Sequence, residues 1–206
     1  MKIINYGHAC FKVISDIDGV SVVFDPYRDN SVPNLRLPNN IESDYVFSSH
    51  DHYDHDAVNK IRVSTNPKPI KLTEIVLPHD KEGGKLRGMS VARIIRFSDY
   101  SICHLGDIGD IRAIEKHNEL KGIDIVLCPI NGFFTISAEE AIKISKIMNW
   151  KIIIPMHYEK KELGIGYPDG GQIDIFKKLH PEFDLIKDNS IEINDKNFEK
   201  GCIIFE

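Results

Sequence analysis

The chain has 206 residues, of which 42% are hydrophobic, and this is enough for one buried core, so we expect a single domain over residues 1–206. A net charge of −5 gives no sign of the basic face that nucleic-acid-binding proteins show, and we expect no nucleic-acid partner. The four cysteines form no Cys-x-x-Cys pair, the chain opens on a strand-like segment, and no apolar run approaches the ~20 residues of a membrane span. We therefore expect a reduced, soluble, cytoplasmic protein without a membrane partner.

The first half of the chain is predicted to be rich in strands. Segments with β-branched and aromatic residues predict strands over 2–6, 9–15, 20–24, 44–48, 73–77, 89–97 and 101–105. Asp18-Gly19 predicts a hairpin turn between the second and third of these strands. Residues 26–43, with several prolines and Asn39-Asn40, predict a long irregular loop, and loops of this length often shape a pocket.

The second half alternates between helical and strand patterns. Helical spacing is found over 111–120, 138–148 and 173–179, and strand patterns over 123–128, 151–156, 190–193 and 202–205. Ser137 with Glu140 predicts a capping box at the start of the second helix, and the glycine-rich stretch 164–171 predicts a mobile loop. Strands followed by helices are typical of two packed sheets with helices outside.

The segment 49–56 contains the densest set of potential metal ligands, arranged as His50-x-His52-x-Asp54-His55. Neutral imidazole and carboxylate are the ligands that divalent metals such as zinc prefer, and a loop after a strand can direct four of them into one pocket. Three further candidates, His79, Asp107 and His157, each follow an apolar run. A solvated polar turn would not require further ligands, so the pattern predicts a metal site.

These motifs resemble the metallo-β-lactamase superfamily, whose loop reads His-x-His-x-Asp-His and whose later ligands are a His, an Asp and a His in that order. Over about residues 1–170 the chain is similar to the small hydrolases related to L-ascorbate-6-phosphate lactonase. The shared pieces are Gly7-His8-Ala9-Cys10-Phe11, Phe24-Asp25-Pro26, His79-Asp80, Arg87-Gly88, His104-Leu105-Gly106-Asp107, Pro129-Ile130-Asn131-Gly132 and Pro155-Met156-His157. The resemblance implies an α/β fold, a four-layer αββα sandwich with two mixed sheets and helices outside.

The resemblance also implies two divalent cations, most simply zinc, with manganese, iron or nickel as alternatives. The expected ligands are His50, His52 and His79 for the first cation, Asp54, His55 and His157 for the second, and Asp107 as a bridge between them. Two such ions can hold a shared hydroxide at neutral pH and polarise a scissile bond, which makes hydrolysis the expected chemistry. The zinc β-lactamases generally carry Cys at the place of Asp107, so cleavage of antibiotics is disfavoured.

Three residues are expected to have roles other than metal binding. Asp54 is a candidate general base as well as a ligand, because a carboxylate beside the attacking water can take its proton. Asp25 resembles the aspartate that orients a ligand histidine in the superfamily, although an aspartate before proline can also simply start a turn. His8 lies in the turn between the first two predicted strands, where it could reach the site as a supporting residue or lie on the surface.

The third ligand of the first cation is open between two histidines. Both His79 and His104 lie between the His50 loop and Asp107 in the sequence. We favour His79 because it directly follows the apolar segment 75–78, whereas His104 precedes Asp107 by three residues and is expected to support it from behind the ligands.

Arg87, Asn131 and Phe133 are the candidate substrate-binding residues. The planar guanidinium of Arg87 can hold a phosphate or carboxylate by two parallel hydrogen bonds, although a surface arginine is the plain alternative. Backbone amides of the turn 129–134 could cradle an oxyanion, and Phe133 or Phe134 could form a pocket floor or belong to the core.

The leading interpretation is a metal-dependent hydrolase that cleaves a small anionic or phosphorylated lactone or ester. A phosphodiesterase acting on a cyclic or linear phosphodiester is the nearest alternative, since the same metal centre serves both. A metal-binding protein without catalysis is a weaker alternative, because structural zinc is usually closed and four-coordinate whereas seven ligands shared by two ions leave room for water. The expected partner is a small-molecule substrate. The sequence leaves open whether the chain forms a homo-oligomer.

Overall fold

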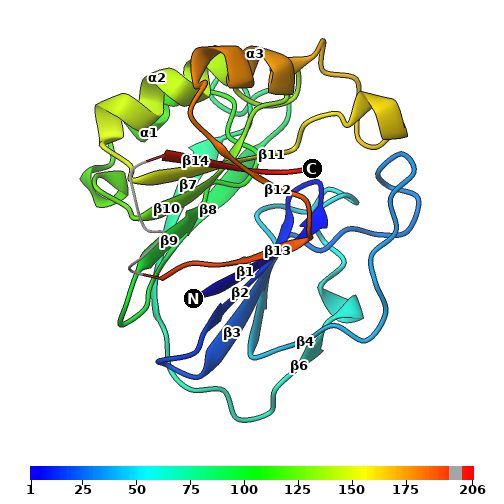
Figure 1. Ribbon diagram of the computed structural model, residues 1–206, viewed down its shortest axis with the longest axis vertical. Coiled ribbons are helices and arrows are strands. Elements are labelled where there is room, and N and C mark those ends of the chain that lie inside the picture. The colour runs from blue at the N-terminus through cyan, green and yellow to red at the C-terminus, as the bar shows by residue number, and fades with distance from the viewer. Residues whose placement is uncertain (195–200) are drawn as a thin grey trace.

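The chain folds into two β-sheets that pack face to face, with helices along the outer face of the larger sheet (Figure 1). The computed structural model describes residues 1–194 and 201–206. Both sheets are mixed, so the predicted α/β fold with two packed mixed sheets is confirmed. In the described ranges, no helix is both long and apolar enough to cross a bilayer.

The smaller sheet is built mainly from the N-terminal quarter of the chain. Its order is β13-β1-β2-β3-β5, with β1 at Lys2–Gly7, β2 at Cys10–Ser15, β3 at Val20–Phe24, β5 at Tyr45–Phe47 and β13 at Ser190–Glu192. Successive strands β1, β2 and β3 are antiparallel, and the predicted hairpin is closed by the amide of Gly19 donating to the Ser15 carbonyl. Strand β5 is parallel to β3 and directs the histidine loop to the end of the sheet. A separate pair joins β4 (Glu42–Ser43) to β6 (Arg62–Val63).

The larger sheet has seven strands in the order β12-β14-β11-β10-β9-β8-β7. They are β7 (Lys71–Pro78), β8 (Met89–Arg96), β9 (Ser101–His104), β10 (Ile125–Pro129), β11 (Ile152–Met156), β12 (Asp184–Ile186) and β14 (Gly201–Phe205). Strands β10 and β11 are buried along their whole length, as expected for parallel strands covered on both faces. Because β9, β10, β11 and β14 are parallel, their carboxyl ends meet at one edge.

Three α-helices cover the outer face of the larger sheet (Figure 1). These are α1 (Ile111–Ile114), α2 (Ala138–Met148) and α3 (Gln172–Leu179), with single 3-10 turns η1 (Val58–Lys60), η2 (Asn118–Leu120) and η3 (Lys161–Leu163) elsewhere. The predicted capping box of α2 is present, since Ser137 accepts from the Glu140 amide and Glu140 accepts from the Ser137 amide.

The helix predicted over 111–120 is shorter than expected. Only α1 and the later turn η2 form, because His117 between them is extended. Leu120 is fully buried and its carbonyl accepts a hydrogen bond from the Trp150 indole at 2.7 Å, which holds this end of the segment away from a helical path. A tertiary contact therefore overrides the local helical pattern.

The two sheets share an apolar core that ties the two halves of the chain together. It is formed by Ile3, Phe11, Val13, Val22 and Phe24 from the smaller sheet and by Ile95, Ile102, Ile125, Leu127, Ile152, Ile154 and Phe205 from the larger one. Full burial of each such side chain contributes roughly 1.5–3 kcal/mol. This core holds the ends of both sheets at fixed positions next to the predicted site.

The outer face of the smaller sheet differs from the expected helical layer. In the described ranges no α-helix covers it; the predicted long loop 26–43 does, together with η1. Tyr27, Val32 and Leu37 of this loop pack on Cys10 and Val23 of the sheet. The prolines and the paired asparagines prevent a helix here, and the loop still provides the apolar side chains that the sheet face needs.

Candidate metal centre

All predicted ligands lie in loops that directly follow strand ends. The segment 49–56 follows β5, His79 follows β7, Asp107 follows β9 and His157 follows β11. The turn between β1 and β2 adds His8 at the same edge of the sandwich. Loops on a rigid pair of sheets can hold such side chains in a fixed geometry.

Asp25 organises the start of the histidine loop. Its Oδ1 accepts from the Ser49 amide and its Oδ2 accepts from the Ser49 hydroxyl, both at 2.6 Å. Oδ2 also lies 2.8 Å from Nδ1 of His55, so the other ring nitrogen, Nε2, faces the centre. A carboxylate behind a ligand imidazole fixes its tautomer and ring orientation, which is the role predicted for Asp25.

The first group of converging nitrogens comes from His50, His52 and His79. One ligand atom from each lies within 4.8 Å of the other two, and His50 Nε2 is 2.9 Å from His52 Nδ1. His52 is exposed while His79 is buried, so the group opens to solvent on the His52 side. His79 is held from behind, because its amide donates to the Gly88 carbonyl at 3.1 Å.

The second group comprises Asp54, His55 and His157, and it also includes His8. The Oδ2 atom of Asp54 lies 3.5 Å from His55 Nε2, 4.0 Å from His157 Nε2 and 3.2 Å from His8 Nε2. His8 therefore comes closer to the Asp54 carboxylate than either predicted ligand histidine does.

Asp107 lies between the two groups. Its Oδ2 atom is near four ring nitrogens: His157 Nε2 at 3.1 Å, His55 Nε2 at 3.2 Å, His79 Nε2 at 3.5 Å and His50 Nε2 at 4.0 Å. Two of these nitrogens belong to each group, so one carboxylate can serve both. The amide of Asp107 is anchored by the Ser90 hydroxyl at 2.9 Å.

The donor set fits divalent cations. Asp107 Oδ1 and His55 Nε2 are buried side-chain atoms without a hydrogen-bond partner. Burial alone would raise the pKa of Asp107, but the neighbouring imidazoles of His157 and His55 lower that pKa well below its ordinary value. Divalent cations held among these atoms would supply the positive charge that so many lone pairs around one ionised carboxylate favour.

Neighbouring groups keep the other two carboxylates near the centre ionised. Burial alone would raise the pKa of Asp25, but His104, His55 and the hydrogen bonds to it lower that pKa to about 2. Burial likewise opposes ionisation of Asp54, whose pKa is nevertheless lowered by hydrogen bonds and charges from His55 and His8. Burial, reinforced by His157, lowers the pKa of His8 to about 4, which leaves its imidazole neutral.

His104 belongs to neither group. Its Nε2 is 2.9 Å from the Ala9 carbonyl, its Nδ1 accepts from the Gly106 amide at 3.1 Å, and its ring stacks on Phe24 with centroids 5.1 Å apart. His79, in contrast, lies in the first group with His50 and His52. The geometry therefore favours His79 over His104 as the third histidine of the first group.

Arg87 lies on an aromatic wall beside the centre. Its guanidinium carbon is 5.5 Å from the Phe133 ring and 5.1 Å from the Phe134 ring. Phe133 is 69% exposed and Phe134 is half-buried, so neither is a core residue. Arg87 precedes Gly88, whose carbonyl binds the His79 amide, and this connects the wall to the first group.

The predicted oxyanion cradle in the turn 129–134 is wrong, because its amides are already used. The amides of Phe133 and Phe134 donate to Asn131 Oδ1 at 3.3 and 3.0 Å, and the Asn131 amide donates to the Thr135 hydroxyl. Asn131 is itself buried, with its side chain folded back into the turn. Its visible role is to shape the turn that presents the two phenylalanines.

Tyr167 is a residue of the site that sequence reasoning missed. Its ring centroid lies 5.5 Å from that of Phe134, 5.8 Å from that of His8 and 6.3 Å from that of His157. Its hydroxyl donates to the Ser31 carbonyl, so the glycine-rich stretch is docked on the long N-terminal loop. The one available signal was an aromatic residue between Gly166 and Pro168, a turn sequence that exposes its side chain.

Comparisons with known proteins agree with this geometry. The profile of the β-lactamase superfamily domain matches residues 2–157. A UPF0173 metal-dependent hydrolase of Staphylothermus marinus is 32% identical over 192 residues, covering 77% of this chain and 84% of that protein. A UPF0173 metal-dependent hydrolase of Natranaerobius thermophilus is 27% identical, covering 94% of this chain and 100% of its own.

Among solved structures, the chain is similar to a Thermotoga maritima protein described as a Zn-dependent hydrolase of the metallo-β-lactamase superfamily. The two superpose with a TM-score of 0.73. They are 29% identical and the match covers 100% of this chain and 98% of that one. The expected fold class is thereby confirmed, and the ligand loops lie on a scaffold shared by metal-dependent hydrolases. The chain belongs to the metallo-β-lactamase superfamily and, within it, to the UPF0173 family of metal-dependent hydrolases.

Proposed function

We propose that this metal-dependent hydrolase works with two divalent cations, most simply zinc, and cleaves a small anionic lactone or ester, preferably a phosphorylated one. The observation that carries the substrate class is the position of Arg87 on the aromatic wall next to the ligand His79. The motifs shared with the ascorbate-6-phosphate lactonase group support a lactone as the scissile group.

The seven predicted ligands would hold the cations in two neighbouring positions. His50, His52 and His79 would hold the first, Asp54, His55 and His157 the second, and Asp107 both. Bound there, the cations would supply Lewis-acid activation of the scissile bond and of the attacking water. The remaining work of binding and proton transfer falls to the side chains of the chain.

Asp54 is our candidate for the group that accepts a proton from the attacking water. Its side chain is 15% exposed, whereas that of Asp107 is 3% exposed, so Asp54 is the carboxylate more open to the substrate side. The pKa of Asp54 is lowered by His55 and His8, so the carboxylate is ionised. A positioned carboxylate in this role contributes about 10²–10⁴-fold to the rate.

Arg87 is our candidate for the group that selects an anion. Four other arginines, Arg28, Arg62, Arg93 and Arg112, are each paired with a carboxylate. Among the described residues, no carboxylate lies within ion-pair distance of Arg87, which contacts aromatic rings instead. A guanidinium held over rings keeps its in-plane donors free for the two parallel hydrogen bonds that a phosphate or carboxylate accepts.

The test is a substrate comparison with the metal-loaded enzyme. Turnover is measured on a phosphorylated lactone, on the same lactone without its phosphate, and on bis-p-nitrophenyl phosphate. Arg87→Met should raise the KM for the phosphorylated lactone by roughly 10- to 150-fold, the equivalent of about 1.5–3 kcal/mol for a hydrogen bond to a charged group. The unphosphorylated lactone should be little affected.

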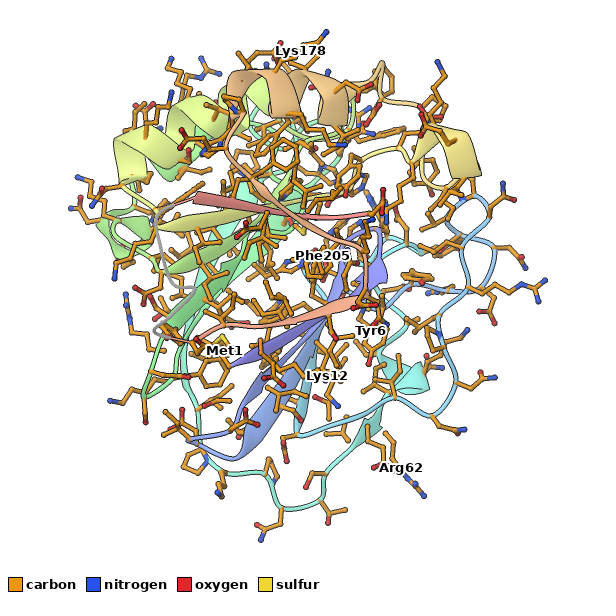
Figure 2. The ribbon with its side chains drawn as sticks, in the orientation of Figure 1. Met1, Tyr6, Lys12, Arg62, Lys178 and Phe205 are labelled. Carbon is orange, nitrogen blue, oxygen red and sulfur yellow. The ribbon has the colours of Figure 1, made fainter. Side chains whose placement is uncertain are left out.

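Arg62→Met is the matched control, because it removes the same charge from strand β6 at the lower end of the molecule (Figure 2). Equal losses on charged and neutral lactones would show that Arg87 supports its loop and does not read the substrate. Turnover of the phosphodiester in preference to both lactones would instead establish a phosphodiesterase. If the metal-loaded enzyme turns over none of the three substrates, the proposed substrate class is wrong.

A further inference from the structure

We propose that Tyr167 is a specificity-determining residue. Its ring and that of Phe134 form a surface on which the ring of a cyclic substrate packs, so that the site prefers a lactone to an open-chain ester of the same charge. The inference rests on the function proposed above and narrows its substrate class to cyclic compounds. It concerns the binding of the substrate ring and leaves the cleavage step unchanged.

Tyr167 extends the aromatic wall to the second group of predicted ligands. The guanidinium carbon of Arg87 is 5.1 Å from the Phe134 ring, and the Phe134 and Tyr167 centroids are 5.5 Å apart. The Tyr167 centroid is in turn 5.8 Å from that of His8 and 6.3 Å from that of His157. Such separations are contact distances between rings. The side chains therefore form one continuous row from the guanidinium to the second group.

This row runs beside both groups of predicted ligands. At one end, the residue that follows Arg87 accepts the His79 amide of the first group with its carbonyl. At the other end, the Tyr167 ring stacks on His157 of the second group, with an angle of 28° between the ring planes. A substrate that reaches both groups and places its anionic group on Arg87 therefore lies along Phe134 and Tyr167.

Hydrogen bonds to the long N-terminal loop hold the Tyr167 ring in place. The Tyr167 hydroxyl donates to the Ser31 carbonyl, and the Gly166 amide donates to the Pro33 carbonyl at 3.3 Å. Gly166 has a φ of 92°, and a Cβ at this position would lie 2.9 Å from the carbonyl oxygen of Tyr158. Glycine is therefore required for the chain to turn here and present the ring that follows.

Asp169 closes the segment on the other side of the ring. Its buried carboxylate accepts from the amides of Glu159 at 2.9 Å and Gly171 at 2.8 Å. The loop 159–171 is thereby fixed around a side chain of its own. Because the Tyr167 ring is already held in position, a substrate that packs on it loses little free energy to ordering the protein.

The surface suits an apolar ring better than a polar group. The hydroxyl proton of Tyr167 is used by Ser31, and Phe134 has no polar atom in its side chain. A rigid ring can lay several C–H groups on such a surface without losing torsional freedom, whereas an open chain must be ordered first. We therefore expect a cyclic substrate whose anionic group lies on a short arm that reaches Arg87.

The experiment measures the binding of two probes to the zinc-loaded full chain by calorimetry. The probes are cyclohexylmethyl phosphate and n-heptyl phosphate, which have equal charge and equal numbers of carbon atoms and differ in the ring. Wild-type protein should bind the cyclic probe more tightly. Tyr167→Leu should weaken binding of the cyclic probe by roughly 2- to 12-fold, the range of a specific ring contact. It should leave binding of the open-chain probe nearly unchanged.

Two further variants separate the ring contact from a structural effect. Tyr167→Phe keeps the ring and should keep the preference for the cyclic probe. Tyr45→Leu is the matched control, because the Tyr45 hydroxyl also donates to a carbonyl, that of Lys68, and its ring stacks on Phe47 of the smaller sheet. It should leave the preference unchanged, and thermal melting checks that every variant folds.

Wild-type protein without a preference for the cyclic probe would overturn the inference, and so would an unchanged preference in Tyr167→Leu. An equal loss of preference in Tyr167→Phe would also overturn it, because the effect would then belong to the hydroxyl and its bond to Ser31. Turnover judges the proposed function separately. A preference for the cyclic probe that depends on Tyr167, in an enzyme that cleaves neither lactone, would overturn the function and support the ring surface.

Discussion

Nδ1 of His55 lies 2.8 Å from Oδ2 of Asp25, and the same oxygen accepts the hydroxyl of Ser49. One buried carboxylate therefore fixes both the start of the histidine loop and the orientation of the His55 ring. We expect Asp25→Asn to weaken metal binding by ~10- to 100-fold, because one of the two accepting oxygens becomes an amide nitrogen that faces a donor. Calorimetric titration of the metal-free protein measures this loss.

Asp44→Asn provides a matched control. Asp44 also accepts from the amide and hydroxyl of a serine, since its Oδ2 binds both groups of Ser21 at 2.8 and 2.9 Å, and no histidine takes part. It should leave metal affinity unchanged. Equal weakening by both substitutions would mean that Asp25 acts through general stability and not through His55.

Two equivalents of a divalent metal per chain are expected, because Asp107 Oδ2 lies near ring nitrogens of both groups. Elemental analysis of protein purified without chelators measures the stoichiometry, and reloading of chelator-stripped protein checks it. A stable maximum of one equivalent would remove the bridging role of Asp107.

His79→Ala should abolish binding of one cation. His104→Ala should still bind both cations, with an affinity lowered by no more than ~10- to 100-fold. The second variant should instead lose stability in the metal-free state, because the buried Ala9 carbonyl loses its partner. An unsatisfied buried group costs about 1–3 kcal/mol, which chemical denaturation can detect. Loss of a cation in His104→Ala but not in His79→Ala would exchange their roles.

The positions of the candidate ligands at strand ends were predictable, because strand ends are readable from alternation and turn residues. The parallel arrangement of β9, β10 and β11 then brings Asp107 and His157 to one edge. The contacts between these loops could not be predicted from the sequence in the same way. The contact of Tyr167 with His8 joins segments that are far apart in the sequence, and no local pattern encodes such a contact.

The turn 129–134 shows the same limit on a smaller scale. A polar turn with glycine suggests free amides, and only the structure shows that Asn131 Oδ1 and the Thr135 hydroxyl already use them. Likewise, the loop 26–43 was readable as irregular, but its packing on Val23 in place of a helical layer depends on the face of the sheet that it covers.

Asp54→Asn should lower turnover by ~10²-fold or more while both cations remain bound, if this carboxylate accepts the proton. Metal content must be measured on the same samples, because Asp54 is also a proposed ligand. Asp51→Asn, at an exposed carboxylate of the same loop, controls for the change in charge. Near-wild-type turnover of fully loaded Asp54→Asn would assign proton transfer to another group.

Asp80 anchors the loop that carries Arg87. Its Oδ1 accepts from the amides of Glu82 and Gly84, and its Oδ2 from those of Leu86 and Arg87, at 2.8 to 2.9 Å. Burial alone would raise the pKa of Asp80, but these backbone hydrogen bonds lower it to about 2, so the loop closes around a carboxylate ion.

Asp80→Asn should loosen this loop without emptying the metal centre, because an amide nitrogen replaces one acceptor and faces two backbone donors. We expect the KM for a phosphorylated substrate to rise by about tenfold, less than in Arg87→Met, since the guanidinium would be present but less restrained. Glu82→Gln, at an exposed carboxylate of the same loop, should leave this KM unchanged. A KM unchanged in Asp80→Asn but raised in Arg87→Met would show that the aromatic wall alone holds the guanidinium. A fall in metal content would show that the loop instead supports His79.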